Sequence, residues 1–180
     1  MAQIAAKLNQ SLSVVRYELT KNKIPRRSRS EAINNWYRDK HNKKPFKLRA
    51  TLSNADQKLK TAGVMLYWGE GGKSGNVVKF TNSDPDMIKI FLQFLRQICG
   101  IDENRLKALV HIYPDHKEKD LILFWAKKTG IPQEHFYKSY LHEGKKGTYK
   151  NKAIWGTITV NYPDKRLLDV ILGWISKYRT

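Results

Sequence analysis

Apolar residues recur at intervals of three and four in four segments after residue 50, which is the spacing of helices that bury one face. We predict the first helix over residues 53–69. Three further helices are expected to begin where an aspartate can act as N-cap. These aspartates are Asp84, Asp115 and Asp164. The second helix has the clearest apolar stripe, which runs from Ile88 to Ile98.

Alternating apolar and polar residues predict strands between these helices. The predicted strands cover residues 77–82, 106–113, 135–142 and 154–160, and we expect the last two to pair as a hairpin. The resulting order of elements is α-β-α-β-α-β-β-α. It predicts a mixed α/β fold of the α+β type for residues 51–180.

One face of the predicted sheet carries polar and basic side chains, because apolar residues take only the alternate positions of each strand. A sheet that buries one face and presents cations on the other fits the groove of a nucleic-acid duplex. A polar face in contact only with water is the alternative. The candidate DNA-binding residues on this face are Arg105, Lys107, His111 and Lys138.

Residues 1–24 predict a helix-turn-helix. Two short helices, 2–8 and 11–21, flank Asn9, which tolerates the positive φ of a tight turn, and Ser11 can cap the second helix. We expect the second helix to contact the major groove of DNA. The side chains that it would present are Ser13, Arg16 and Tyr17. A helical hairpin without a role in DNA binding is the alternative.

The net charge indicates a polyanionic partner. The 180 residues include 34 Lys and Arg against 16 Asp and Glu, which gives a formal charge of +18 at pH 7. Residues 21–50 hold 11 of the basic residues and two of the acidic ones, so we predict a basic linker over 25–50 that either binds phosphates or is merely solvated. Further candidate DNA-binding residues lie in this linker and in a later loop: Arg26, Arg27, Arg29, Lys145, Lys146, Lys150 and Lys152.

Several other classes of protein are disfavoured. No apolar run approaches the roughly 20 residues that span a bilayer, and residues 1–10 lack the apolar core of a signal peptide, so we expect a cytoplasmic protein without membrane contact. The five histidines lack zinc-binding spacing. Residues 69–74 end like a phosphate-binding loop but lack its first glycine, and Cys99 lies on an apolar helical stripe that predicts a core position.

Residues 62–71 combine small residues, an apolar helical pattern and a carboxylate. Gly63 is expected to permit close approach of a second helix. Glu70 falls at the carboxyl end of the predicted helix, where a negative charge opposes the helix dipole by about 0.3–1 kcal/mol. A bound divalent cation would explain this position, because Mg²⁺ prefers oxygen ligands. A glutamate in contact with water in a turn is the alternative.

At these residues the chain resembles the LAGLIDADG homing-endonuclease family, with residues 63–71 as a single copy of its nonapeptide motif. Gly69 replaces a small alanine of the motif. The matching positions are Leu66, Glu70 and Gly71. The resemblance covers about residues 52–178 and includes 80–85, which look like the family's first strand turning into its next helix. Residues 24–28, after the helix-turn-helix, are similar to an arrangement found in some members.

The resemblance implies a homodimer whose motif helices pack together and place one acidic residue from each copy beside shared divalent ions. Glu70 would be this ligand, for Mg²⁺ or Mn²⁺. Lys79 would lie near a position that the family uses for a polar residue around the metal site, and an ordinary DNA-facing lysine is the alternative there.

These observations predict site-specific binding and metal-dependent cleavage of double-stranded DNA. A transcriptional regulator or structural module that binds DNA on the same fold without cleaving it is the alternative. RNA binding fits the charge equally well, but the predicted helix-turn-helix does not support it.

Overall fold

The computed structural model describes residues 2–25, 28–33, 46–145, 147 and 153–179. The chain divides into two compact units, Met1–Lys43 and Lys44–Thr180. The division falls inside the segment 25–50, for which the sequence predicts a basic linker. Each unit is described by itself below.

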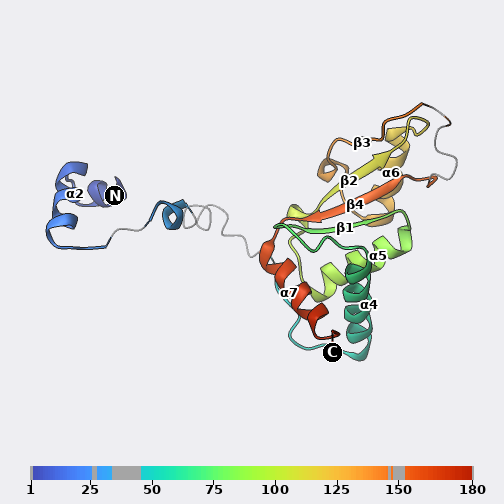
Figure 1. Ribbon diagram of the computed structural model, residues 1–180, viewed down its shortest axis with the longest axis horizontal. Coiled ribbons are helices and arrows are strands. Elements are labelled where there is room, and N and C mark those ends of the chain that lie inside the picture. Colours follow the sequence, from blue (N-terminus) through green and yellow to red (C-terminus); the bar gives the residue numbers. More distant parts are fainter. Residues whose placement is uncertain (1, 26–27, 34–45, 146, 148–152, 180) are drawn as a thin grey trace. The chain divides into compact units, whose positions relative to one another are not determined.

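The smaller unit begins with the short helices α1 (Ala2–Lys7) and α2 (Leu12–Lys21) (Figure 1). Asn9 between them has a φ of 49°, as expected for a turn that needs a left-handed residue. The Ser11 hydroxyl accepts a hydrogen bond from the backbone N–H of Val14 at 3.3 Å, so Ser11 caps α2 as predicted.

The larger unit has a mixed α/β fold, in the predicted order of helices and strands. Its α-helices are α4 (Asn54–Glu70), α5 (Pro85–Gln93), α6 (Glu118–Thr129) and α7 (Lys165–Ser176). Short helices follow α5, precede the second strand and follow α6: η1 (Phe94–Ile98, a π-helix), η2 (Glu103–Arg105) and η3 (Gln133–His135). The strands are β1 (Val78–Asn82), β2 (Lys107–Ile112), β3 (Tyr140–Leu141) and β4 (Thr157–Tyr162). No helix in the described ranges is long and apolar enough to cross a membrane.

Two of the three predicted aspartate caps are confirmed. Asp84 and Asp164 accept backbone N–H bonds from the first turns of α5 and α7. The prediction for Asp115 is wrong, because α6 begins at Glu118 after Lys117, which makes no side-chain cap. The Asp115 carboxylate instead accepts a hydrogen bond from the backbone N–H of Gly147 at 3.2 Å, within the loop region.

The four strands form one sheet in the order β1-β4-β2-β3. β4 pairs antiparallel with both β1 and β2, whereas β3 runs parallel to β2 on its outer edge. The predicted hairpin of residues 135–142 and 154–160 is therefore wrong. Burial explains the difference, because β4 is almost entirely buried in the middle of the sheet, while Tyr140 and Leu141 of β3 are each more than half exposed.

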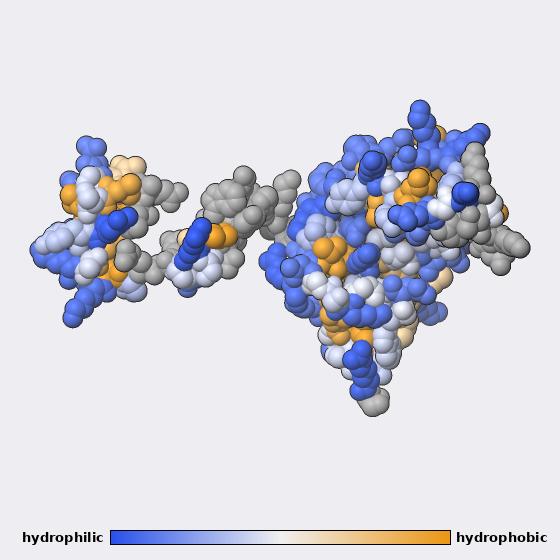
Figure 2. Space-filling view, turned by 45° about the horizontal axis from the view of Figure 1, so that its top comes forward, coloured by the Kyte–Doolittle hydropathy of each residue, from blue (hydrophilic) through white to orange (hydrophobic). Residues whose placement is uncertain are grey.

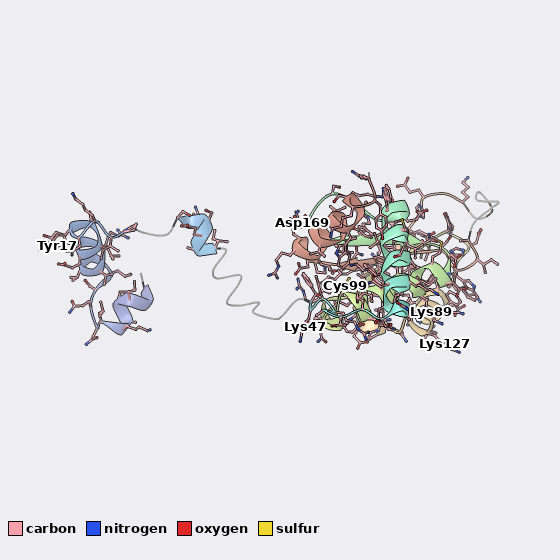
Figure 3. All side chains as sticks on the ribbon, turned by 90° about the horizontal axis from the view of Figure 1, so that it is seen from below. Tyr17, Lys47, Lys89, Cys99, Lys127 and Asp169 are labelled. Carbon is pink, nitrogen blue, oxygen red and sulfur yellow. The ribbon has the colours of Figure 1, made fainter. Side chains whose placement is uncertain are left out.

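Helices α4, α5 and α7 lie together on one side of the sheet (Figure 1). Alternate strand residues point into a single apolar core that they share with the helices. Phe80 of β1 stacks on Phe91 of α5, with 4.2 Å between ring centroids, and Trp125 of α6 is fully buried. Cys99 lies in this core (Figure 3), where burial raises the pKa of its thiol, which rules it out as a nucleophile at neutral pH.

The other face of the sheet is lined mainly by polar side chains, and we call it the polar face. It consists of Lys79, Thr81, Lys107, Leu109, His111, Thr157, Thr159 and Asn161. Alternation across the strands, predicted from the sequence, is confirmed here, because β2 alternates between partly exposed and buried residues along its whole length. The visible surface of the larger unit is mostly hydrophilic, with small separate hydrophobic patches (Figure 2).

Candidate nucleic-acid interface

Glu70 is the last residue of α4 and its side chain is exposed. Within the described residues, Glu70 makes no hydrogen bond or ion pair, and the last turn of α4 contains no basic residue. The carboxylate therefore lies uncompensated at the negative end of the helix dipole. This agrees with the position expected from the sequence, and it leaves the carboxylate oxygens free to bind a cation.

The backbone after Glu70 is fixed by contacts between α4 and β1. The Tyr67 hydroxyl donates a hydrogen bond to the carbonyl of Gly72, and the Gly72 N–H donates to the carbonyl of Lys79 at 2.8 Å. A Cβ at residue 71 would overlap the Tyr67 ring, so glycine is required there. Burial raises the pKa of Tyr67 to about 12, so its hydroxyl stays protonated and can donate.

Tyr67 is the residue of this site that the sequence interpretation missed. Its aromatic ring lies in the core, stacked on Phe91 with 5.6 Å between centroids, and only its hydroxyl is used at the turn. Its position three residues before Glu70, on the buried side of a helix, gives no indication of that role. The glycine pair at residues 71–72 is the one feature of the sequence that indicates a close approach.

Lys79 lies at the same corner of the larger unit as the end of α4. It is exposed on β1, and a Cβ built at Gly72 would lie 3.5 Å from the Lys79 Cβ. The sheet register aligns Lys79 with Asn161 of β4, and Asn161 with Lys107 of β2. Two cations therefore flank an amide on one row of the polar face, beside the turn that carries Glu70.

The outer side of α4 borders an apolar groove of about 450 Å³ between α4 and α5. Figure 3, seen from the side of the helices, shows α4 between Asp169 of α7 and Lys89 of α5. Glu70 lies at one end of the groove. The other lining residues are Ala62, Met65, Leu66, Gly69, Met87 and Ile90.

Gly63 does not line this groove, and the second helix that it allows to approach is η1 of the same chain, so Gly63 is not available for packing against a second copy. A Cβ at residue 63 would overlap the side chain of Phe94, so Gly63 permits contact between α4 and η1 of the same chain. The small residues that face the groove are Ala62 and Gly69, and a Cβ at Gly69 would meet no atom within 4 Å.

A hydrogen-bonded row crosses three strands of the polar face. The Thr81 and Thr159 hydroxyl oxygens are 2.9 Å apart, and the Thr159 hydroxyl lies 2.9 Å from Nε2 of His111. The ring of His111 neighbours those of Tyr140 and His142, with centroid distances of 5.6 and 5.7 Å. His111 thus lies on the polar face as predicted, surrounded by other rings.

Arg105 does not lie on the polar face, where the sequence predicts it. It ends η2, and its guanidinium bonds to Asp164 at 3.2 Å and to the carbonyl of Pro163, while packing over the Tyr162 ring. Arg105 therefore joins η2 to the start of α7, and it pairs with an Asp164 carboxylate that Arg166 also contacts at 3.4 Å. Lys138 and Lys145 are exposed in the segments before and after β3.

In the smaller unit, Arg16 and Tyr17 are exposed on α2, and the Ser13 hydroxyl lies 2.8 Å from that of Ser11. Arg29 is exposed in a short helical stretch, residues 29–33. Five of the predicted DNA-binding residues lie outside the described ranges: Arg26, Arg27, Lys146, Lys150 and Lys152.

Glu70 has no partner ligand within the described part of its own chain. Among the described residues, no group of three His, Cys, Asp or Glu side chains is close enough to hold a metal ion. A cation at Glu70 would need further oxygen donors, such as the free carbonyls of the last helical turn or a carboxylate from a second chain. Comparison with protein-family models, curated proteins and solved structures found no match to the chain.

Proposed function

We propose that the protein binds double-stranded DNA at specific sites and cleaves it as a homodimer that uses Mg²⁺ or Mn²⁺. The observation that carries this proposal is the exposed, unpaired carboxylate of Glu70, which lies between an apolar groove and the basic end of the polar face. Such a carboxylate has no role in stabilising its own helix. The expectations from the LAGLIDADG resemblance agree with this location.

Dimerisation through the groove would complete the metal site. An exposed apolar surface on α4 and α5 favours association with another protein surface, and a second copy of α4 offers an equally apolar partner. A two-fold axis along α4 would bring the two Glu70 carboxylates together. A divalent ion in such a site activates water and stabilises the leaving oxygen of a phosphodiester.

The polar face supports the binding of the duplex. Lys79 and Lys107 can neutralise phosphates, while Asn161 between them and Thr81 farther along β1 can donate and accept hydrogen bonds at base edges. Lys79 is closest to the turn after Glu70, where its charge would hold the scissile phosphate. The formal charge of +18 supplies a long-range attraction for DNA.

The test is a cleavage assay on a library of randomised duplexes with Mg²⁺ or Mn²⁺, followed by the same assay on Glu70→Gln. We expect Glu70→Gln to abolish cleavage because the metal ligand is lost. DNA binding should be at least as tight as that of the parent, because a negative charge near phosphates is removed. Glu134→Gln, which removes an exposed carboxylate elsewhere, is the matched control and should cleave normally.

A DNA-binding regulator without nuclease activity is the second candidate. The observation that favours it is α2, whose exposed Arg16 and Tyr17 are suited to a DNA groove independently of Glu70. A parent protein that binds one duplex specifically, yet leaves both strands intact with either metal, would replace the nuclease proposal with this one.

A further inference from the structure

Thr159 is a buried polar residue whose bonding differs from that of the others. It lies in the middle of β4 with 1% of its surface exposed, and its hydroxyl bonds only to the side chains of Thr81 on one side and His111 on the other. The remaining buried polar side chains among the described residues bond backbone groups: Asp56, Thr129 and Asp164. Thr159 therefore connects the partly exposed side chains of Thr81 and His111, and its hydroxyl does not cap a backbone group.

The direction of the hydrogen bonds in this row depends on His111, because each hydroxyl has one proton to donate. If Nε2 of His111 carries a proton, it donates to Thr159, Thr159 donates to Thr81, and the Thr81 proton points outward. If Nε2 is unprotonated, Thr159 donates to it and Thr81 donates to Thr159. Thr81 then offers only lone pairs to a ligand.

We propose that Thr81, Thr159 and His111 form one hydrogen-bond relay that recognises a base edge, with the protonation of His111 deciding which ends of the relay donate. The relay deepens the proposed DNA-binding function and rests on it. Thr81 and His111 contact the base, while Thr159 is a positioning residue that transmits the state of one end to the other.

The surroundings of His111 favour its neutral form before DNA binds. The charged and titratable groups that face it are Lys79 from β1, Tyr140 from β3 and His142 after β3. Burial, and then electrostatic interaction with His142 and Lys79, lower the pKa of His111. DNA phosphates would oppose these charges, so binding is expected to take up a proton as the pH falls.

The two charge states of the relay suit different bases. Nδ1 of His111 is neither hydrogen-bonded nor buried within the described residues, so it can meet a ligand. Neutral His111 leaves one donor and one acceptor at the two ends of the relay, which matches N7 and the amino group of adenine. Protonated His111 leaves a donor at both ends, which matches N7 and O6 of guanine.

The experiment measures equilibrium binding to a duplex selected from a random library and to every single-base-pair variant of it, at pH 6 and pH 8. For the parent we expect the preference at one base pair to move from adenine toward guanine at pH 6, by about fivefold, the equivalent of one net hydrogen bond. Thr159→Val should lose this pH-dependent shift. Thr157→Val, a threonine of the same face without a side-chain bond in the described residues, should retain the shift.

Two further variants separate recognition from folding. Thr81→Val removes the end of the relay and should lose discrimination at the same base pair at both pH values, whereas Thr81→Ser should restore it. Specific binding by the parent with a base preference that does not change with pH would overturn the relay and leave the DNA-binding proposal intact. Retention of the shift in folded Thr159→Val would do the same. Absence of binding to every duplex would overturn the proposed function itself.

Discussion

The two sides of α4 differ in a way that separates folding from function. Its inner side is closed by its own chain, because Gly63 is pressed against Phe94 and Tyr67 is fully buried beside Phe91. Its outer side, with Met65 and Leu66, borders a groove that no described residue fills. One helix therefore carries a surface that fixes its position and a surface left for another molecule.

This comparison is tested most severely by the same substitution on each side of α4. Gly63→Ala should lower the free energy of unfolding by about 3 kcal/mol, because the added methyl group overlaps Phe94. Gly69→Ala adds a methyl group to open space and should raise the free energy of unfolding by about 0.5 kcal/mol, because alanine has the higher helix propensity. Urea denaturation of both variants measures the difference. Equal effects would show that the inner side is not tightly packed.

A charge in the groove should act on assembly and leave the fold unchanged. Met65→Asp is expected to weaken the homodimer by about 2 kcal/mol, because the carboxylate would be buried against apolar groups of the second copy. Sedimentation equilibrium gives the dissociation constant, and urea denaturation gives the stability of the monomer. Leu123→Asp, an exposed position on α6, is the control and should dimerise like the parent. A parent that is monomeric alone and on DNA would remove the proposed role of the groove.

The smallest expected effect concerns the hydroxyl of Tyr67. Tyr67→Phe should cost about 1 kcal/mol, the net contribution of the bond to the Gly72 carbonyl. Since the pKa of Tyr67 is raised from 10.0 to about 12, the folded state holds its proton where the unfolded chain loses it. The free energy of unfolding of the parent should therefore fall as the pH rises from about 10 to about 12. Tyr67→Phe should fall less over that interval, and an identical slope in both proteins would contradict the assignment.

Features governed by neighbouring residues could be predicted from the sequence. Asp84 and Asp164 cap their helices, Asn9 adopts a positive φ, and Glu70 ends α4, because each depends on a few adjacent positions. Asp115 is the exception, since its carboxylate bonds to Gly147 in a distant loop.

Features that depend on residues far apart in the sequence could not be predicted. The apolar alternation of residues 154–160 predicts a strand but does not show which strands flank it, and the nearest strand in sequence was the wrong choice. The same limit applies to the site, because the side of α4 that Gly63 occupies is decided by Phe94. The basic character of Arg105 likewise gave no indication that it would pair with Asp164.

The central place of β4 also determines when the sheet can form during synthesis. Its register joins Phe80 to Val160 and Val160 to Ala108, so β1 and β2 become neighbours of one strand that is synthesised after both of them. Pairing across such sequence separations slows folding, and a nascent chain that stops before residue 157 leaves the inner edges of β1 and β2 unpaired. Residues 157–162 must therefore be synthesised before the polar face exists, and chains truncated before them should aggregate through these open edges.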